Sequence, residues 1–200
     1  MNSFIRPCGA ALFGGGVLLV VTNAFLTPML PTALGDAATR SSTIYLLRMS
    51  ASGASAFFLL IGSVGLYLAH RREAGVFGAI AFAMTFLGNS LLVAVEWSNV
   101  FVLRALALVN PGALSALDES PLMTIGFASA ASAFALGWLL LAISLLRAKI
   151  IPVWQPLSVL AGLIMIPLLA ATPLGMAGAV IGNAVFGIGL AAVGYSVWRL

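Results

Sequence analysis

The chain has 200 residues, of which 62% are hydrophobic and only 7% are charged. A soluble domain carries about a quarter charged residues, so this composition excludes a water-soluble fold. The net charge of +4 comes from nine cations that stand singly or in pairs, without the basic stripe of a nucleic-acid-binding protein. The composition therefore predicts the lipid bilayer as a partner and no nucleic-acid partner.

The first predicted membrane span, about residues 9–30, ends where Pro28 and Pro31 interrupt the helix. An alternative for this segment is a cleaved secretory signal, with Arg6 as its charged region. Its apolar stretch of more than about twenty residues is long for a signal core, so we expect retention. The second and third spans are predicted at about 44–69 and 75–97.

The longest run without an Asp, Glu, Lys, Arg or His residue extends over 49 residues, from Ile150 to Trp198. One helix of that length would measure about 74 Å, against a hydrocarbon core of about 30 Å. The run must therefore cross twice, and the turn signal at 172–175 divides it. Before it, Pro121 after the N-cap residue Ser120 begins another span. The last three spans are predicted at about 121–146, 154–171 and 175–198.

The sequence thus predicts an all-α bundle of six transmembrane spans in a single domain, residues 1–200. With a cytoplasmic N-terminus, six of the nine cations fall on the cytoplasmic side and three on the other side, as the positive-inside rule requires. An even number of spans then places the C-terminus in the cytoplasm as well. The cytoplasmic cations are Arg6, Arg71, Arg72, Arg147, Lys149 and Arg199.

Residues 98–120 form the one long connection and are predicted to be extracytoplasmic. The apolar part, 100–109, contains only Arg104 as a charge and is too short to span a bilayer. Three alternatives remain open: the third helix continues beyond the membrane, the segment lies flat as an interfacial helix, or it dips back into the membrane. An interfacial segment over the helix mouth is the favoured interpretation.

The positions of small residues and prolines predict how the helices of the bundle pack. Gly137 and the pair Gly178 and Gly182 give flat stripes that allow close approach of helix backbones. Pro156 and Pro167 make the fifth span irregular, and a broken helix can line a binding site in transporters. No carboxylate lies in the last three spans to couple an ion, so kinked packing is the favoured interpretation of these prolines.

The carboxylate of Glu96, near the outer end of the third span, is the strongest functional candidate, because a bare charge there is costly. In an antiparallel pair of helices, Arg48 and Glu96 reach nearly the same depth, which predicts an ion pair joined by Arg104. Such a pair serves either as a structural clamp or as the polar floor of an outward-facing pocket. The candidate ligand-binding residues are Arg48, Asn89, Glu96 and Arg104.

Three asparagines, Asn23, Asn89 and Asn183, are predicted at mid-membrane depth on three different helices. They could form an interhelical hydrogen-bond network, in which each member contributes about 0.6–2 kcal/mol. Alternatively, they could line a polar cavity for a neutral ligand.

The sequence predicts no enzyme. Residues 53–56, Gly-Ala-Ser-Ala, resemble the serine motif of rhomboid intramembrane proteases, which also have six core helices. That chemistry needs a histidine beside Ser55, and the only histidine, His70, lies fifteen residues along the same helix, about 22 Å away. His70 is instead predicted to be solvated at the interface beside Arg71. One histidine and one cysteine, Cys8, predict no metal site, no haem and no other cofactor.

Residues 137–147, followed by Pro-Val-Trp at 152–154 and Leu-Ala-Gly at 160–162, resemble a segment of bacterial multi-span membrane protein families of unknown function. In that segment a glycine-bearing helix ends in Leu-Leu-Arg, and a Pro-x-Trp loop leads into a Leu/Gly-rich helix. The resemblance covers about 26 of the 200 residues. It implies a location in a bacterial cytoplasmic (inner) membrane.

Two classes of function follow from the sequence. The favoured one is a non-catalytic membrane component that acts as a homo-oligomer or as a subunit beside a membrane protein partner. The alternative is a protein that binds or transports a small solute or a lipid through the outward-facing pocket defined above.

Overall fold

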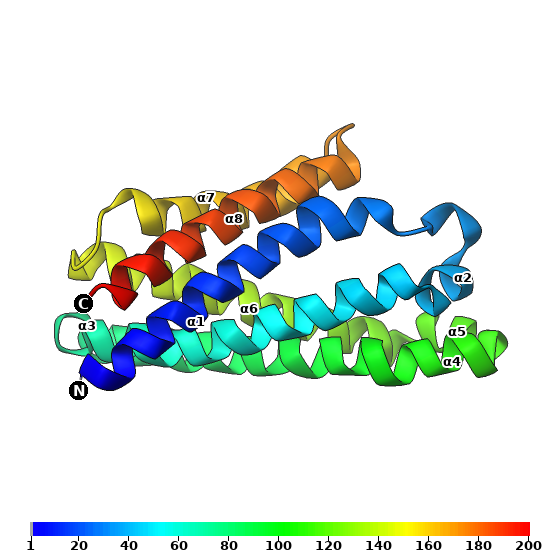
Figure 1. Cartoon of the computed structure of the whole chain (residues 1–200), viewed down its shortest axis with the longest axis horizontal. Helices are drawn as coiled ribbons and strands as arrows, with labels where there is room; N and C mark the ends of the chain where they lie inside the picture. The colour runs from blue at the N-terminus through cyan, green and yellow to red at the C-terminus, as the bar shows by residue number, and fades with distance from the viewer. Residues whose placement is uncertain (1) are drawn as a thin grey trace.

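A computed structural model describes residues 2–200, which form helices and no strands (Figure 1). Short 3₁₀ or π-helical segments join several of the α-helices. In chain order the elements are α1 (Asn2–Val21), η1 (Thr22–Leu26), η2 (Thr27–Met29), η3 (Thr32–Leu34), α2 (Asp36–Ser41), α3 (Thr43–Ser98), η4 (Asn99–Leu103), α4 (Arg104–Val109), α5 (Pro111–Asp118), α6 (Pro121–Ala148), α7 (Trp154–Ala170) and α8 (Gly175–Trp198).

The 56 residues of α3 reverse direction at Gly75, so that its two halves run side by side (Figure 1). Gly75 has φ 57° and ψ −149°, a backbone conformation that is essentially restricted to glycine. The sequence predicted a connection at about 70–74 between two spans, whereas the helix continues to this glycine. A single residue outside the helical region is enough to turn the chain back, so no loop is needed.

Four stretches of the described chain are long and apolar enough to cross a membrane. One of them, the 67 residues of Thr43–Val109, contains the reversal at Gly75. A fifth apolar helix, α7, has only 17 residues. The four stretches are Ser3–Met29, Thr43–Val109, Pro121–Ala148 and Gly175–Trp198.

The helices pack in a continuous series. α1 lies between α3 and α8, α3 also packs along α6, and α7 packs along α8. The interior between them is mostly apolar, with a few buried polar side chains, and its largest fully buried side chains include Trp138, Phe186 and Leu190. Both termini lie at one end of the bundle, and α2, α4 and α5 lie at the other end (Figure 1).

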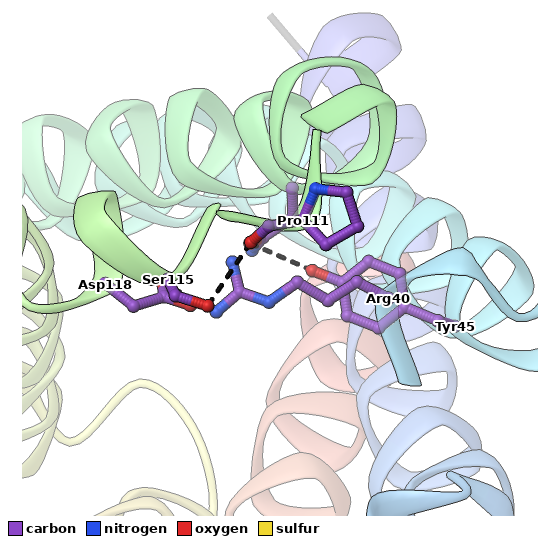
Figure 2. A network of polar contacts seen from close by, with 6 residues as sticks. Arg40, Tyr45, Pro111, Ser115 and Asp118 are labelled. Atoms are coloured by element: carbon purple, nitrogen blue, oxygen red, sulfur yellow. Dashed lines mark hydrogen bonds and ion pairs between the residues drawn. The ribbon is translucent and has the colours of Figure 1, made fainter. Parts of the chain in front are cut away.

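The end that carries α2, α4 and α5 is closed by a small cap. After Ser98 the helix continues through η4 and α4 to Val109, and α5 then folds back. Arg40 of α2 reaches Asp118 at the end of α5 with an Nη2–Oδ1 distance of 2.9 Å (Figure 2). The backbone therefore follows the first alternative for 98–120, continuation of the third helix, and the position of this segment relative to lipid stays a prediction.

Glycines bring the helix backbones into direct contact. A Cβ atom added at Gly88 would lie 2.5 Å from the Cα atom of Phe134, and one added at Gly137 would lie 2.5 Å from the Cα atom of Thr85. Gly182 is equally close to the backbone of Ile166 in α7. The predicted role of small residues in close packing is therefore seen at both Gly137 and Gly182.

The contact at Gly88 gives a direct stability test. We expect Gly88→Ala to lower the free energy of unfolding by about 1–3 kcal/mol, because the added methyl group displaces the backbone of α6. The matched control is Gly126→Ala, where no atom lies within 4 Å of the added Cβ, and which should be neutral or stabilising by up to about 1 kcal/mol. The measurement is thermal unfolding in detergent. Equal melting temperatures of the two variants would contradict the close α3–α6 contact.

Candidate functional site

A cavity of about 370 Å³ lies between α1, both halves of α3, α6, α7 and α8. Its volume is in the range of roughly 300–1,000 Å³ that is typical of small-molecule sites. Most of its wall is apolar, with side chains such as Phe134 and Ile166. The polar lining residues come from four separate helical segments: Asn23, Arg48, Ser52, Glu96 and Asn183.

Two asparagines present carbonyl oxygens to the cavity wall. The Nδ2 group of Asn23 donates to the backbone oxygen of Leu19 (2.9 Å), and the Nδ2 group of Asn183 donates to that of Ala179 (2.9 Å). One N–H of each amide is thus used within its own helix. Only an amide nitrogen can donate to a backbone carbonyl, so each side chain keeps its oxygen as an acceptor for a ligand, beside its second N–H.

Asn23 belongs to η1, a π-helical turn that follows α1. Such wide turns are rare and are frequently found at functional sites. A second π-helical turn, η4, begins at Asn99, which contacts Glu96. Sequence analysis did not predict either turn, because no residue pattern specifies one.

Glu96 is held by a chain of hydroxyl and amide donors and is only 6% exposed. Its Oε1 atom accepts a hydrogen bond from the Ser52 hydroxyl (2.6 Å), and its Oε2 atom accepts one from Asn99 Nδ2 (3.5 Å). The Tyr45 hydroxyl donates in turn to Asn99 Oδ1 (3.2 Å). The two halves of α3 are therefore joined across the carboxylate by neutral groups.

The predicted ion pair between Arg48 and Glu96 is wrong, since no such contact within 4.0 Å occurs in residues 2–200. Arg48 Nε donates to Thr27 Oγ1 (3.3 Å), and Nη1 donates to the Met49 sulfur (3.0 Å). Both side chains nevertheless line the same cavity, and their equal depth in the membrane stays a prediction. Ser52, one helical turn after Arg48, takes the position beside the carboxylate, and the guanidinium turns toward the end of the first span instead.

The predicted contact of Arg104 with Arg48 and Glu96 is also wrong. The Arg104 Nη2 atom donates to the backbone oxygen of Ser41 (3.2 Å), which ties the start of α4 to the end of α2 within the cap. Of the four predicted ligand-binding residues, Arg48 and Glu96 share the cavity wall. Arg104 lies in the cap, and Asn89 is buried elsewhere.

Asn89 is completely buried between α3 and α6. Its Nδ2 group donates to Thr85 O (2.8 Å), and its Oδ1 atom accepts from Trp138 Nε1 (3.4 Å). Across residues 2–200 the three predicted asparagines do not hydrogen-bond to one another. The cavity interpretation therefore describes Asn23 and Asn183, and Asn89 is a helix-to-helix contact.

His70 was predicted to be solvated, and this prediction is wrong because the side chain is 0% exposed. Its Nδ1 atom lies 2.6 Å from Leu66 O and its Nε2 atom lies 3.3 Å from Ser144 Oγ on α6. From the sequence alone, Ser55 was the candidate serine partner of His70. Ser144 lies three residues before Arg147, level with His70 beside Arg71, and this shared depth was the signal that could have found it. Ser144 is 1% exposed, so a substrate has no access to this Ser–His contact.

Comparisons with known proteins identify no relative. The chain matches no known family model, no curated protein and no solved structure. The resemblance of residues 137–162 to bacterial multi-span membrane proteins stays a prediction.

The buried position of Asn89 gives a second stability test. We expect Asn89→Leu to lower the stability by about 0.6–2 kcal/mol, because the Trp138 Nε1–H group loses its acceptor in an apolar interior. Asn183→Leu should leave the stability unchanged or higher, because the hydrogen bond of its side chain stays within its own helix. Thermal unfolding in detergent compares the two. A larger loss of stability in Asn183→Leu than in Asn89→Leu would contradict the structural role of Asn89.

Proposed function

We propose that this chain is an integral protein of a bacterial cytoplasmic membrane, with six spans and both termini in the cytoplasm. The reversal at Gly75 divides the longest apolar stretch into two spans, and α7 supplies another. The 17 residues of α7 measure about 26 Å, which a modest local thinning of the bilayer accommodates. The position of both termini at one end of the bundle supports an even number of spans.

We further propose that the protein binds a small zwitterionic molecule in the cavity, as a binding protein or carrier. The observation that carries this proposal is Arg48. Its half-buried guanidinium lies in the wall of a largely apolar cavity, with a hydroxyl and a thioether as hydrogen-bond partners. The Glu96 carboxylate lies on the same wall, but no carboxylate comes within 4.0 Å of Arg48 in residues 2–200. A charge in that environment is costly unless a counter-charge compensates it. A phosphate or carboxylate group of a ligand supplies that counter-charge with matching geometry.

The rest of the polar wall favours hydrogen-bond donors on the same ligand. Glu96 and the amide oxygens of Asn23 and Asn183 are acceptors, and they come from three different segments. A primary ammonium group has three N–H donors and a positive charge that complements the carboxylate. Arginine on one side and acceptors on the other therefore fit a molecule that carries one anionic and one ammonium group.

A purely structural subunit, the function favoured by the sequence, gives no reason for this arrangement. An arginine that only clamps two helices is stabilised most by a carboxylate partner, and Glu96 is close enough in depth to be that partner. Instead, Glu96 is satisfied by Ser52 and Asn99. That the chain is not an enzyme remains a prediction.

The binding proposal predicts ligand-dependent stability. We expect millimolar phosphoethanolamine, which has one phosphate and one ammonium group, to raise the melting temperature of the protein in a maltoside detergent. A ligand at about one hundred times its Kd stabilises by about 2.7 kcal/mol. Arg48→Gln should abolish this shift, while the exposed Arg6→Gln, at the opposite end of α1, should retain it. An equal shift in wild type and Arg48→Gln, or none in either, would contradict the proposed site.

The topology is tested by cysteine labelling in intact cells. In a Cys8→Ser background, we expect Ala116→Cys in α5 to react with a membrane-impermeant maleimide from outside. Glu73→Cys, near the reversal of α3, should react only after the membrane is permeabilised, because it lies on the cytoplasmic side. Both positions are exposed in the structure. The opposite pattern would invert the orientation, and external labelling of both would exclude the six-span topology.

A further inference from the structure

An apolar groove of about 590 Å³ runs along the outside of the bundle between α6 and α7. Its walls are Leu136 and Leu139 on α6 and Ile164 and Leu168 on α7, among other apolar side chains. Ile164 and Leu168 are 58% and 61% exposed. In a bilayer this surface faces hydrocarbon, so an acyl chain can lie in it without displacing water.

The groove and the polar cavity adjoin each other. Ala135, Leu163 and Pro167 line both of them, so they form the junction between the two spaces. Two other apolar hollows, between α3 and α6 and between α1 and α8, share no lining residue with the cavity. The seam between α6 and α7 is therefore the one lipid-facing groove of these three that leads to Arg48 and Glu96.

The junction also offers a polar backbone group. Pro167 has no N–H group and cannot donate the usual helical hydrogen bond to the carbonyl oxygen of Leu163. Leu163 and Pro167 both lie at the junction. The carbonyl oxygen of Leu163, which lacks the hydrogen bond from residue 167, needs another donor in an apolar environment. The irregularity of α7 thus occurs where a ligand would pass from the apolar groove to the polar cavity.

We propose that the ligand is a single-chain zwitterionic lipid, which enters from the bilayer between α6 and α7. Its phosphate lies at Arg48, its ammonium group lies among Glu96, Asn23 and Asn183, and its one acyl chain occupies the groove. This inference rests on the proposed zwitterion site and adds the lipid class and the route. A single chain follows from a single adjoining groove, because the two other hollows share no lining residue with the head-group cavity.

The test compares two probes: phosphoethanolamine, the head group alone, and lysophosphatidylethanolamine, the same head group with one acyl chain. We expect the lysolipid to bind at least about tenfold more tightly, since buried methylene groups add affinity. Protein in nanodiscs of phosphatidylglycerol, which lacks a zwitterionic head group, is titrated with lysolipid. Native mass spectrometry then counts the fraction of protein that carries it.

The decisive variant fills the groove from both walls. Leu136→Trp with Ile164→Trp should reduce lysolipid affinity by about tenfold or more and leave the melting shift with phosphoethanolamine unchanged, which also shows that the variant is folded. The matched control, Leu122→Trp with Ile125→Trp, changes the same residue types on exposed positions of α6 outside the groove, and should bind as wild type does.

The outcomes separate the two proposals. If the groove variant keeps full lysolipid affinity while head-group binding depends on Arg48, the lipid route is wrong and the zwitterion site stands. If lysophosphatidic acid, which lacks the ammonium group, binds as well as lysophosphatidylethanolamine, the zwitterionic class is wrong. If neither probe binds in an Arg48-dependent way, both proposals fail.

Discussion

The cost of an ionised side chain inside an apolar bundle governs the site. Helical spans satisfy their own backbone groups, so charged side chains are the groups that still need partners in hydrocarbon. Glu96 obtains its partners from Ser52 and Asn99 within the protein. Arg48 has neutral partners only, and it lies where the helices separate enough to leave a cavity. The cavity therefore lies where two opposite charges, on Arg48 and Glu96, face the same space without forming an ion pair.

The sequence predicted the helices well, because charge-free runs of spanning length leave little alternative to helix in a bilayer. Depth counting from the shared turn also placed Arg48 and Glu96 at one level, and both line the cavity. The directions of the Arg48 and Glu96 side chains could not be predicted. They depend on Ser52, which lies one turn after Arg48 and hydrogen-bonds to the Glu96 carboxylate. They also depend on Thr27, which comes from another helical segment and accepts a hydrogen bond from Arg48.

The polar contacts that the sequence missed lie between helices rather than within one. His70 meets Ser144, and Asn89 meets Trp138, both across the α3–α6 interface. Each residue was interpreted by its depth in its own helix, and depth alone does not say which helix is the neighbour. That pairing follows from Gly88 and Gly137, which let the backbones of α3 and α6 touch and so bury every side chain between them.

The same distribution of glycines explains why the bundle is open on one side. Gly137 of α6 faces α3, and Gly162 of α7 faces Phe186 of α8, so each of these helices uses its close-approach glycine on a different neighbour. The α6–α7 seam is lined instead by side chains such as Leu136, Leu139 and Leu163, which hold the two backbones apart. Close packing of α6 against α3 and of α7 against α8 therefore leaves a groove between α6 and α7, and the polar cavity adjoins this groove. The groove between α6 and α7 is thus a consequence of the positions of the small residues.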